Sequence, residues 1–120
     1  MSYELMHFNI DQFRCFCCGE NHMNDRFLQK LDKARHLADY PFKILSGYRC
    51  KHHNKKVGGV ETSAHLSGQA ADIQAKDNYA RFKIIHALLA AGFNRLIVHK
   101  TFIHVDCDDE KPQEIFVIKC

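Results

Sequence analysis

Two short segments in the second half of the chain place histidine and aspartate side chains in strand-like settings. The first carries His65 and Asp72, and the second carries His104 and Asp106. Imidazoles and carboxylates of this kind supply the three protein ligands of a catalytic zinc, which keeps one further position for water. A structural zinc is instead closed by four ligands, commonly cysteines.

The spacing of His65 and Asp72 excludes a straight helix if both residues bind the same ion. A helix would separate them by roughly 10 Å, whereas both donor atoms must lie within about 2 Å of the metal. Gly68 interrupts the run, and residues 70–75 read as a short strand with Asp72 and Ile73 on opposite faces. We therefore expect His65 on a loop that folds back over Asp72.

The segment 102–107 alternates with a period of two, which puts His104 and Asp106 on one face and apolar side chains on the other. Residues 95–99 form a second apolar run just before it. The two residues between these runs are enough for a hairpin turn, which would bring His99 near His104.

The rest of the chain alternates between helical and strand patterns. One helix is capped by Asn24-Asp25 and ends before Tyr40-Pro41, and another is capped by Asp77-Asn78 and ends at Gly92. We also expect strands over 42–45 and 114–118 and a short helix over 54–57. The second long helix has an expected apolar side made by Phe82, Ile85, Leu88 and Leu89. The sequence predicts an α+β fold, a small antiparallel sheet flanked by helices, as a single domain over residues 1–120.

Composition limits the classes of partner. The chain has 120 residues and is 46% hydrophobic, which suffices for one core. It lacks an apolar stretch near 18 residues and the pattern of a signal peptide, so we expect a cytoplasmic protein as synthesised, with no membrane insertion. A net charge of +3 without a base-reading motif does not favour nucleic acid. We expect a monomer.

Three separated motifs resemble one known family. They are Ser46-Gly47-Tyr48-Arg49, the segment from His65 to Asp72, and Ile103-His104-Val105-Asp106. In this order they look like the zinc D-alanyl-D-alanine carboxypeptidase family of the hedgehog/DD-peptidase fold, specifically its small single-domain members from phages and bacteria. The similarity runs from about residue 8 to residue 107.

The resemblance implies roles for individual residues. His65, Asp72 and His104 match the family's ligands for Zn²⁺, the same three that the spacing favours. Arg49 matches an arginine that holds a carboxylate or carbonyl of the substrate, a task suited to a planar fork that stays charged. The alternative is that Arg49 pairs with Asp106 or another carboxylate and orders its loop.

The general base departs from the commonest family pattern. Many relatives place a glutamate three residues before the last histidine ligand, but this position is Thr101. Another branch resembles this chain in having a histidine five residues before that ligand, which is His99 here, and its ordinary pKa near 6.5 suits proton transfer. Asp106 acting through water is the competing base, and His99 would then only close the hairpin.

The resemblance implies a zinc metallopeptidase that hydrolyses peptide bonds in peptidoglycan stem peptides, as a D,D-carboxypeptidase or an endopeptidase, with a zinc-bound water as the nucleophile. Such an enzyme acts on the cell wall if it is released from the cell. The alternative is a non-catalytic zinc-containing binding module on the same fold, as in hedgehog domains, because a fold and a metal do not guarantee turnover.

Six cysteines need a separate explanation. Four of them, Cys15, Cys17, Cys18 and Cys50, fall in the half of the chain without the expected zinc ligands. The resemblance implies that these four lie close in space. Ordinary thiols, a disulfide formed after release, and a second metal site all remain open, although C-x-C-C is not the paired C-x-x-C pattern of a zinc ribbon.

Overall fold

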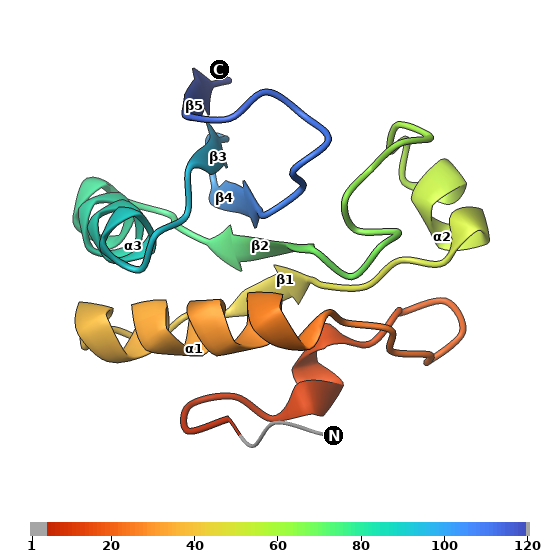
Figure 1. The fold of residues 1–120 in the computed structure, drawn as a ribbon, viewed down its shortest axis with the longest axis horizontal. Coiled ribbons are helices and arrows are strands. Elements are labelled where there is room, and N and C mark those ends of the chain that lie inside the picture. Colours follow the sequence, from red (N-terminus) through yellow and green to blue (C-terminus); the bar gives the residue numbers. More distant parts are fainter. Residues whose placement is uncertain (1–4, 120) are drawn as a thin grey trace.

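The computed structural model describes residues 5–119 and contains one mixed sheet with helices packed on it (Figure 1). The fold class is α+β, as predicted. The elements are the 3₁₀ helix η1 (Ile10–Phe13), α1 (Asp25–Ala38), β1 (Ile44–Ser46), α2 (Lys51–Lys56), β2 (Ala70–Gln74), α3 (Asn78–Ala90), β3 (Arg95–Val98), β4 (Phe102–Asp106) and β5 (Ile115–Ile118).

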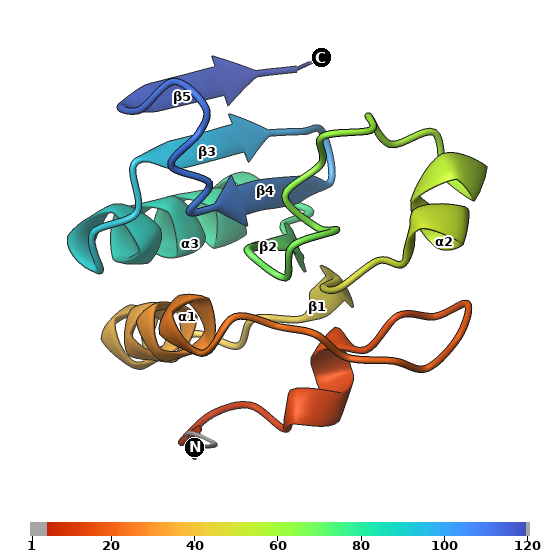
Figure 2. The same cartoon turned by 45° about the vertical axis from the view of Figure 1, so that its right-hand side comes forward.

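The five strands follow the order β1-β2-β4-β3-β5, which Figure 2 shows from bottom to top. The pairs β1–β2, β2–β4 and β3–β4 are antiparallel. The last strand, β5, lies parallel to β3, so the sheet is mixed and not antiparallel throughout. The expected hairpin is present, because the backbone N–H of His99 donates to the carbonyl of Phe102 at 2.9 Å across the turn between β3 and β4.

Strand register divides the sheet into a polar and an apolar face. His104 is paired with Asp72 on one side and with Ile97 on the other, and directly paired residues share a face. Because side chains alternate along each strand, His99 and Asp106 fall on this same face. The expected placement of the polar residues on one face is therefore confirmed.

The opposite face of the sheet carries the core. Ile73, Ile103 and Val105 are fully buried there and belong to one cluster with apolar residues of α1 and α3, such as Leu31 and Ile84. The Asn24 side chain caps α1, as expected, by accepting from a backbone N–H of its first turn. The Asp77 side chain caps α3 in the same way. The two helices thus cover one side and leave the polar face of the sheet to the loops around α2.

The orientation of α3 differs from the sequence prediction. Phe82 and Leu89 are exposed, whereas Ala80, Ile84 and Ala87 are buried together with Leu88. Apolar residues lie on all sides of this helix, so their spacing could not fix which side packs. The small alanine side chains allow close approach, and the larger ones remain outside.

The elements nearest the polar face are shifted from their predicted positions. The strand β1 is shorter and begins two residues later than expected, and α2 begins at Lys51 because Cys50 acts as its N-cap. Among the helices of residues 5–119, none combines the length and the apolar character needed to cross a bilayer.

Candidate metal centre

His65, Asp72 and His104 converge on one point at the polar face of the sheet. The Asp72 Oδ1 atom lies 3.3 Å from His65 Nε2 and 3.0 Å from His104 Nδ1. Donor atoms about 2.0–2.1 Å from a tetrahedral zinc are about 3.3 Å from one another. The three side chains therefore fit a common metal ion, and the set of two imidazoles and one carboxylate suits zinc.

The loop that carries His65 folds back over β2, as expected. Its ring is buried, and His65 Nδ1 lies 2.7 Å from the carbonyl oxygen of Gly47. Because a carbonyl only accepts, Nδ1 carries a proton, and Nε2 faces Asp72 Oδ1. Nε2 donates to that oxygen when it is protonated and offers a lone pair to a metal when it is not. A side chain at Gly47 would collide with the backbone of Phe13, since a Cβ there would lie 2.7 Å from its Cα atom. Glycine thus allows the close approach that positions this carbonyl.

The His104 ring is oriented through its other nitrogen. Its Nε2 atom lies 2.7 Å from Asp106 Oδ2. The buried Asp106 carboxylate also accepts from Arg95 Nε at 2.7 Å and from the backbone N–H of Asp108 at 3.1 Å. Since an ionised carboxylate only accepts, Nε2 carries a proton and Nδ1 faces Asp72 Oδ1. Nδ1 donates to that oxygen when it is protonated and offers a lone pair to a metal when it is not.

The Asp72 carboxylate is charged and held on both oxygens. Burial alone would raise its pKa, but hydrogen bonds from His104 and His65 hold the pKa of Asp72 well below the usual range. Its second oxygen, Oδ2, pairs with Arg49 at 3.2 Å. Asp72 therefore offers Oδ1 toward the two imidazoles while Arg49 fixes the rotation of the carboxylate.

Arg49 lies beside the three converging residues. In addition to Asp72, its guanidinium contacts Ser46 Oγ at 3.1 Å through Nε and Asn54 Oδ1 at 3.3 Å through Nη1. These contacts use three of its five N–H donors. The carboxylate that pairs with Arg49 is Asp72, and Asp106 pairs with Arg95 instead.

His99 directly follows β3, and its ring stacks on Phe102 with centroids 4.1 Å apart. Burial lowers the pKa of His99, the Asp72 charge raises it, and the His104 and Lys119 charges lower it, with a net decrease. Two of the three converging residues, Asp72 and His104, thus influence the pKa of His99 through their charges. Thr101, at the position of the commoner family glutamate, is exposed in the hairpin turn.

The family model described as Peptidase M15 matches residues 4–106 of the chain. The chain belongs to this family. It is the zinc D-alanyl-D-alanine carboxypeptidase family that the sequence motifs resemble, so that resemblance is confirmed. No curated protein matches the chain.

Membership of the M15 peptidases supports a metallopeptidase that acts on a peptide substrate. Members are metal-dependent, and the structure supplies groups that could hold the metal. The matched region, residues 4–106, includes His65, Asp72 and His104.

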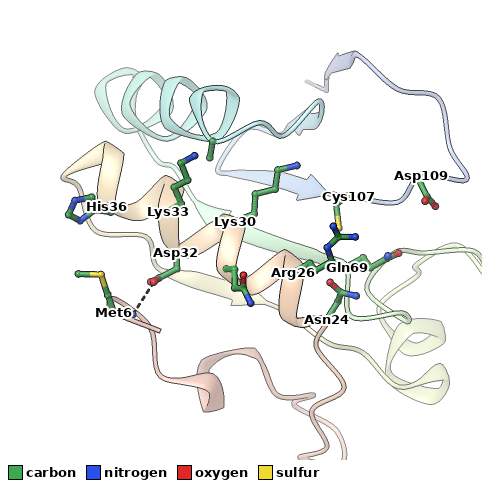
Figure 3. A pocket seen from close by; sticks show the side chains of 12 residues that line it. Met6, Asn24, Arg26, Lys30, Asp32, Lys33, His36, Gln69, Cys107 and Asp109 are labelled. Carbon is green, nitrogen blue, oxygen red and sulfur yellow. Dashed lines mark hydrogen bonds between the residues drawn. The ribbon is translucent and has the colours of Figure 1, made fainter. Parts of the chain in front are cut away.

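A cavity of about 820 Å³ lies elsewhere, along α1 (Figure 3). Lys30 and Lys33 line it together with Cys107, which belongs to the apolar face of the sheet. None of the three converging residues lines this cavity. In this M15 peptidase the converging side chains and the cavity are therefore separate features.

Two groups at the metal centre were not predicted from the sequence. Arg95 alternates with Ile97 and His99 along β3, so the period of two could have placed it on the polar face. The Gly47 carbonyl could not have been found, because every residue has a carbonyl and only the folded loop brings this one to His65.

Proposed function

We propose that this protein is a zinc-dependent peptidase that hydrolyses peptide bonds in peptidoglycan stem peptides. The observation that carries the proposal is the convergence of His65 Nε2, Asp72 Oδ1 and His104 Nδ1 at distances of 3.0–3.3 Å. The family match supports peptide hydrolysis. The resemblance of this chain to D-alanyl-D-alanine carboxypeptidases narrows the proposed substrate to peptides that contain D-amino acids.

The three converging residues would hold Zn²⁺ through two neutral imidazoles and one carboxylate. When bound, zinc polarises a scissile carbonyl and lowers the pKa of a water molecule toward about 7. The Gly47 carbonyl accepts a hydrogen bond from one nitrogen of His65, and the Asp106 carboxylate accepts one from a nitrogen of His104. The other nitrogen of each ring is thereby oriented to bind the metal.

His99 would move protons between the attacking water and the leaving amine. Its place on the same face as His104 supports this role, as does its lowered pKa, which keeps the ring neutral and able to accept a proton near pH 7. Asp106 is the weaker candidate for the base, since both of its oxygens already accept hydrogen bonds from Arg95, His104 and the Asp108 backbone. Asp106 would instead position His104.

Arg49 would act in two ways. It fixes the Asp72 carboxylate, and its remaining N–H donors would hold a carboxylate or carbonyl of the peptide. The substrate would then lie across the polar face between Arg49 and His99. Release from the cell would give the enzyme access to the cell wall.

The second candidate function is a non-catalytic zinc-binding module, and Thr101 is the observation that favours it. Digestion of purified peptidoglycan separates the two functions. Mass spectrometry of the muropeptides should show a new product with wild type, no product after chelation, and little with His65→Ala or His99→Ala. The matched control is His86→Ala, which changes an exposed histidine on α3 and should retain activity.

The mass of the product also identifies the bond. Loss of one terminal alanine indicates a carboxypeptidase, whereas separation of a crosslinked dimer indicates an endopeptidase. A wild-type protein that contains zinc at the three converging residues but yields no product would support the binding module and overturn the enzymatic proposal.

A further inference from the structure

A second cluster of potential metal ligands lies near the start of the chain. The thiols of Cys15, Cys18 and Cys50 all lie within 4.8 Å of one another. Cys15 and Cys18 follow η1, and Cys50 directly precedes α2. This cluster shares no residue with the candidate metal centre, and peptide hydrolysis as proposed above does not use it.

A tight turn brings Cys15 and Cys18 together. The Cys15 N–H donates to the Glu20 carbonyl at 2.8 Å, and the Gly19 N–H donates to the Cys15 carbonyl at 2.8 Å. Gly19 has φ +76°, a conformation that glycine adopts without strain. The turn therefore contains a C-x-x-C pair, Cys15 and Cys18, followed by Gly19.

The separation of two of the sulfur atoms distinguishes a disulfide from a pair of ligands on one metal ion. Cys15 Sγ and Cys50 Sγ are 3.7 Å apart. Two thiolates about 2.3 Å from a tetrahedral zinc lie about 3.8 Å from one another, whereas the sulfurs of a disulfide are about 2.05 Å apart. The separation is too long for a disulfide, and it fits two ligands on one ion as well as the hydrogen bond from Cys15 Sγ to Cys50 Sγ.

Backbone N–H groups point at the same sulfurs. The Cys50 N–H donates to Cys15 Sγ at 3.5 Å, and the His53 N–H donates to Cys50 Sγ at 3.3 Å. Such donors stabilise negative charge on sulfur and orient it. Cys17 lies in the same turn, between Cys15 and Cys18, and its thiol is exposed.

We propose that Cys15, Cys18 and Cys50 bind a second, structural Zn²⁺ as thiolates and that Cys17 supplies the fourth ligand. Four thiolates close a zinc site and leave no position for a substrate. The ion would tie the turn after η1 to the residue next to Arg49. An existing hydrogen bond of 2.8 Å, from the Tyr48 N–H to the Phe13 carbonyl, already joins these two segments.

Zinc content of the reduced protein tests the proposal. We expect Cys18→Ser to lower the content by one zinc per chain relative to wild type. Because Cys18 is exposed, its replacement leaves no cavity in the core. Cys107→Ser, which changes a cysteine outside the cluster, should leave the content unchanged. His65→Ala reports on the other metal centre, so failure of the proposed function there does not affect this comparison.

Protection of the thiols from alkylation provides a second test on the unmodified protein. Cys17 and Cys18 are exposed, so iodoacetamide can reach both thiols unless zinc is bound. We expect slow labelling of both in the zinc-loaded protein and faster labelling after a chelator is added. Equal zinc content in wild type and Cys18→Ser would overturn the proposal. So would a labelling rate that the chelator does not change. A mass 2 Da lower in reducing buffer, which indicates a Cys15–Cys50 disulfide, would overturn it as well.

Discussion

His104 Nε2 lies 2.7 Å from Asp106 Oδ2, whereas the other ring nitrogen, Nδ1, faces Asp72. Asp106 is almost completely buried and is also paired with Arg95. A buried aspartate two residues after a histidine on the same strand therefore fixes both the tautomer and the orientation of that imidazole. This relationship makes Asp106 a positioning residue in our account.

Replacement of Asp106 by asparagine tests this relationship. The amide offers one oxygen where His104 and Arg95 both need an acceptor, so one of them loses its partner. We expect the affinity for zinc at the His65 centre to fall about 10–100-fold, measured by competition with a chromophoric chelator in a Cys18→Ser background. Asp109→Asn, at an exposed position, is the control. Unchanged affinity in Asp106→Asn would show that the carboxylate does not position His104.

Replacement of His99 by alanine separates proton transfer from metal binding. General acid–base catalysis contributes about 10²–10⁴-fold, so we expect kcat to fall by that factor. The zinc content should not change, because His99 is not among the three converging residues. A variant with full kcat would exclude His99 as the base, and a variant without zinc would place it in the metal site.

The pH dependence of kcat/KM should reflect the environment of His99. The base works in its neutral form, and the net effect of burial and neighbouring charges lowers the pKa of His99 below 6.5. Activity should therefore persist below pH 6.5 and decline only at more acidic pH. The measurement is a pH profile on a soluble peptide substrate. A decline that begins well above pH 6.5 would contradict the assignment.

Arg49→Lys should impair the enzyme although the charge is retained. An ammonium can pair with Asp72 but cannot also reach Ser46 and Asn54 with the geometry of a guanidinium. Loss of one hydrogen bond to a charged group costs about 1.5–3 kcal/mol, so we expect kcat/KM to fall at least about tenfold. Arg26→Lys, on the exposed side of α1, is the matched control. Equal activity of Arg49→Lys and wild type would exclude the proposed role.

The sheet could be predicted where one face is buried and the other is polar. In β4 the alternation of Ile103 and Val105 with His104 and Asp106 fixed both the strand and its polar face. The same rule failed for α3, because apolar residues surround that helix and only the packing against α1 selects Ala80 and its neighbours.

The candidate site was predictable to the extent that its residues lie on strands or in family motifs. His65 and Asp72 are close in sequence, and the break at Gly68 excluded a helix. The contact between Arg49 and Asp72 depends on the path of the chain between β1 and β2, and no local pattern encodes that path. The gathering of Cys50 with Cys15 has the same origin.

The most direct test of the account is anomalous diffraction above the zinc absorption edge from crystals of the wild-type protein. We expect an anomalous peak about 2.0–2.2 Å from each of His65 Nε2, Asp72 Oδ1 and His104 Nδ1. Crystals grown with zinc that show these three side chains in place without a peak between them would contradict it.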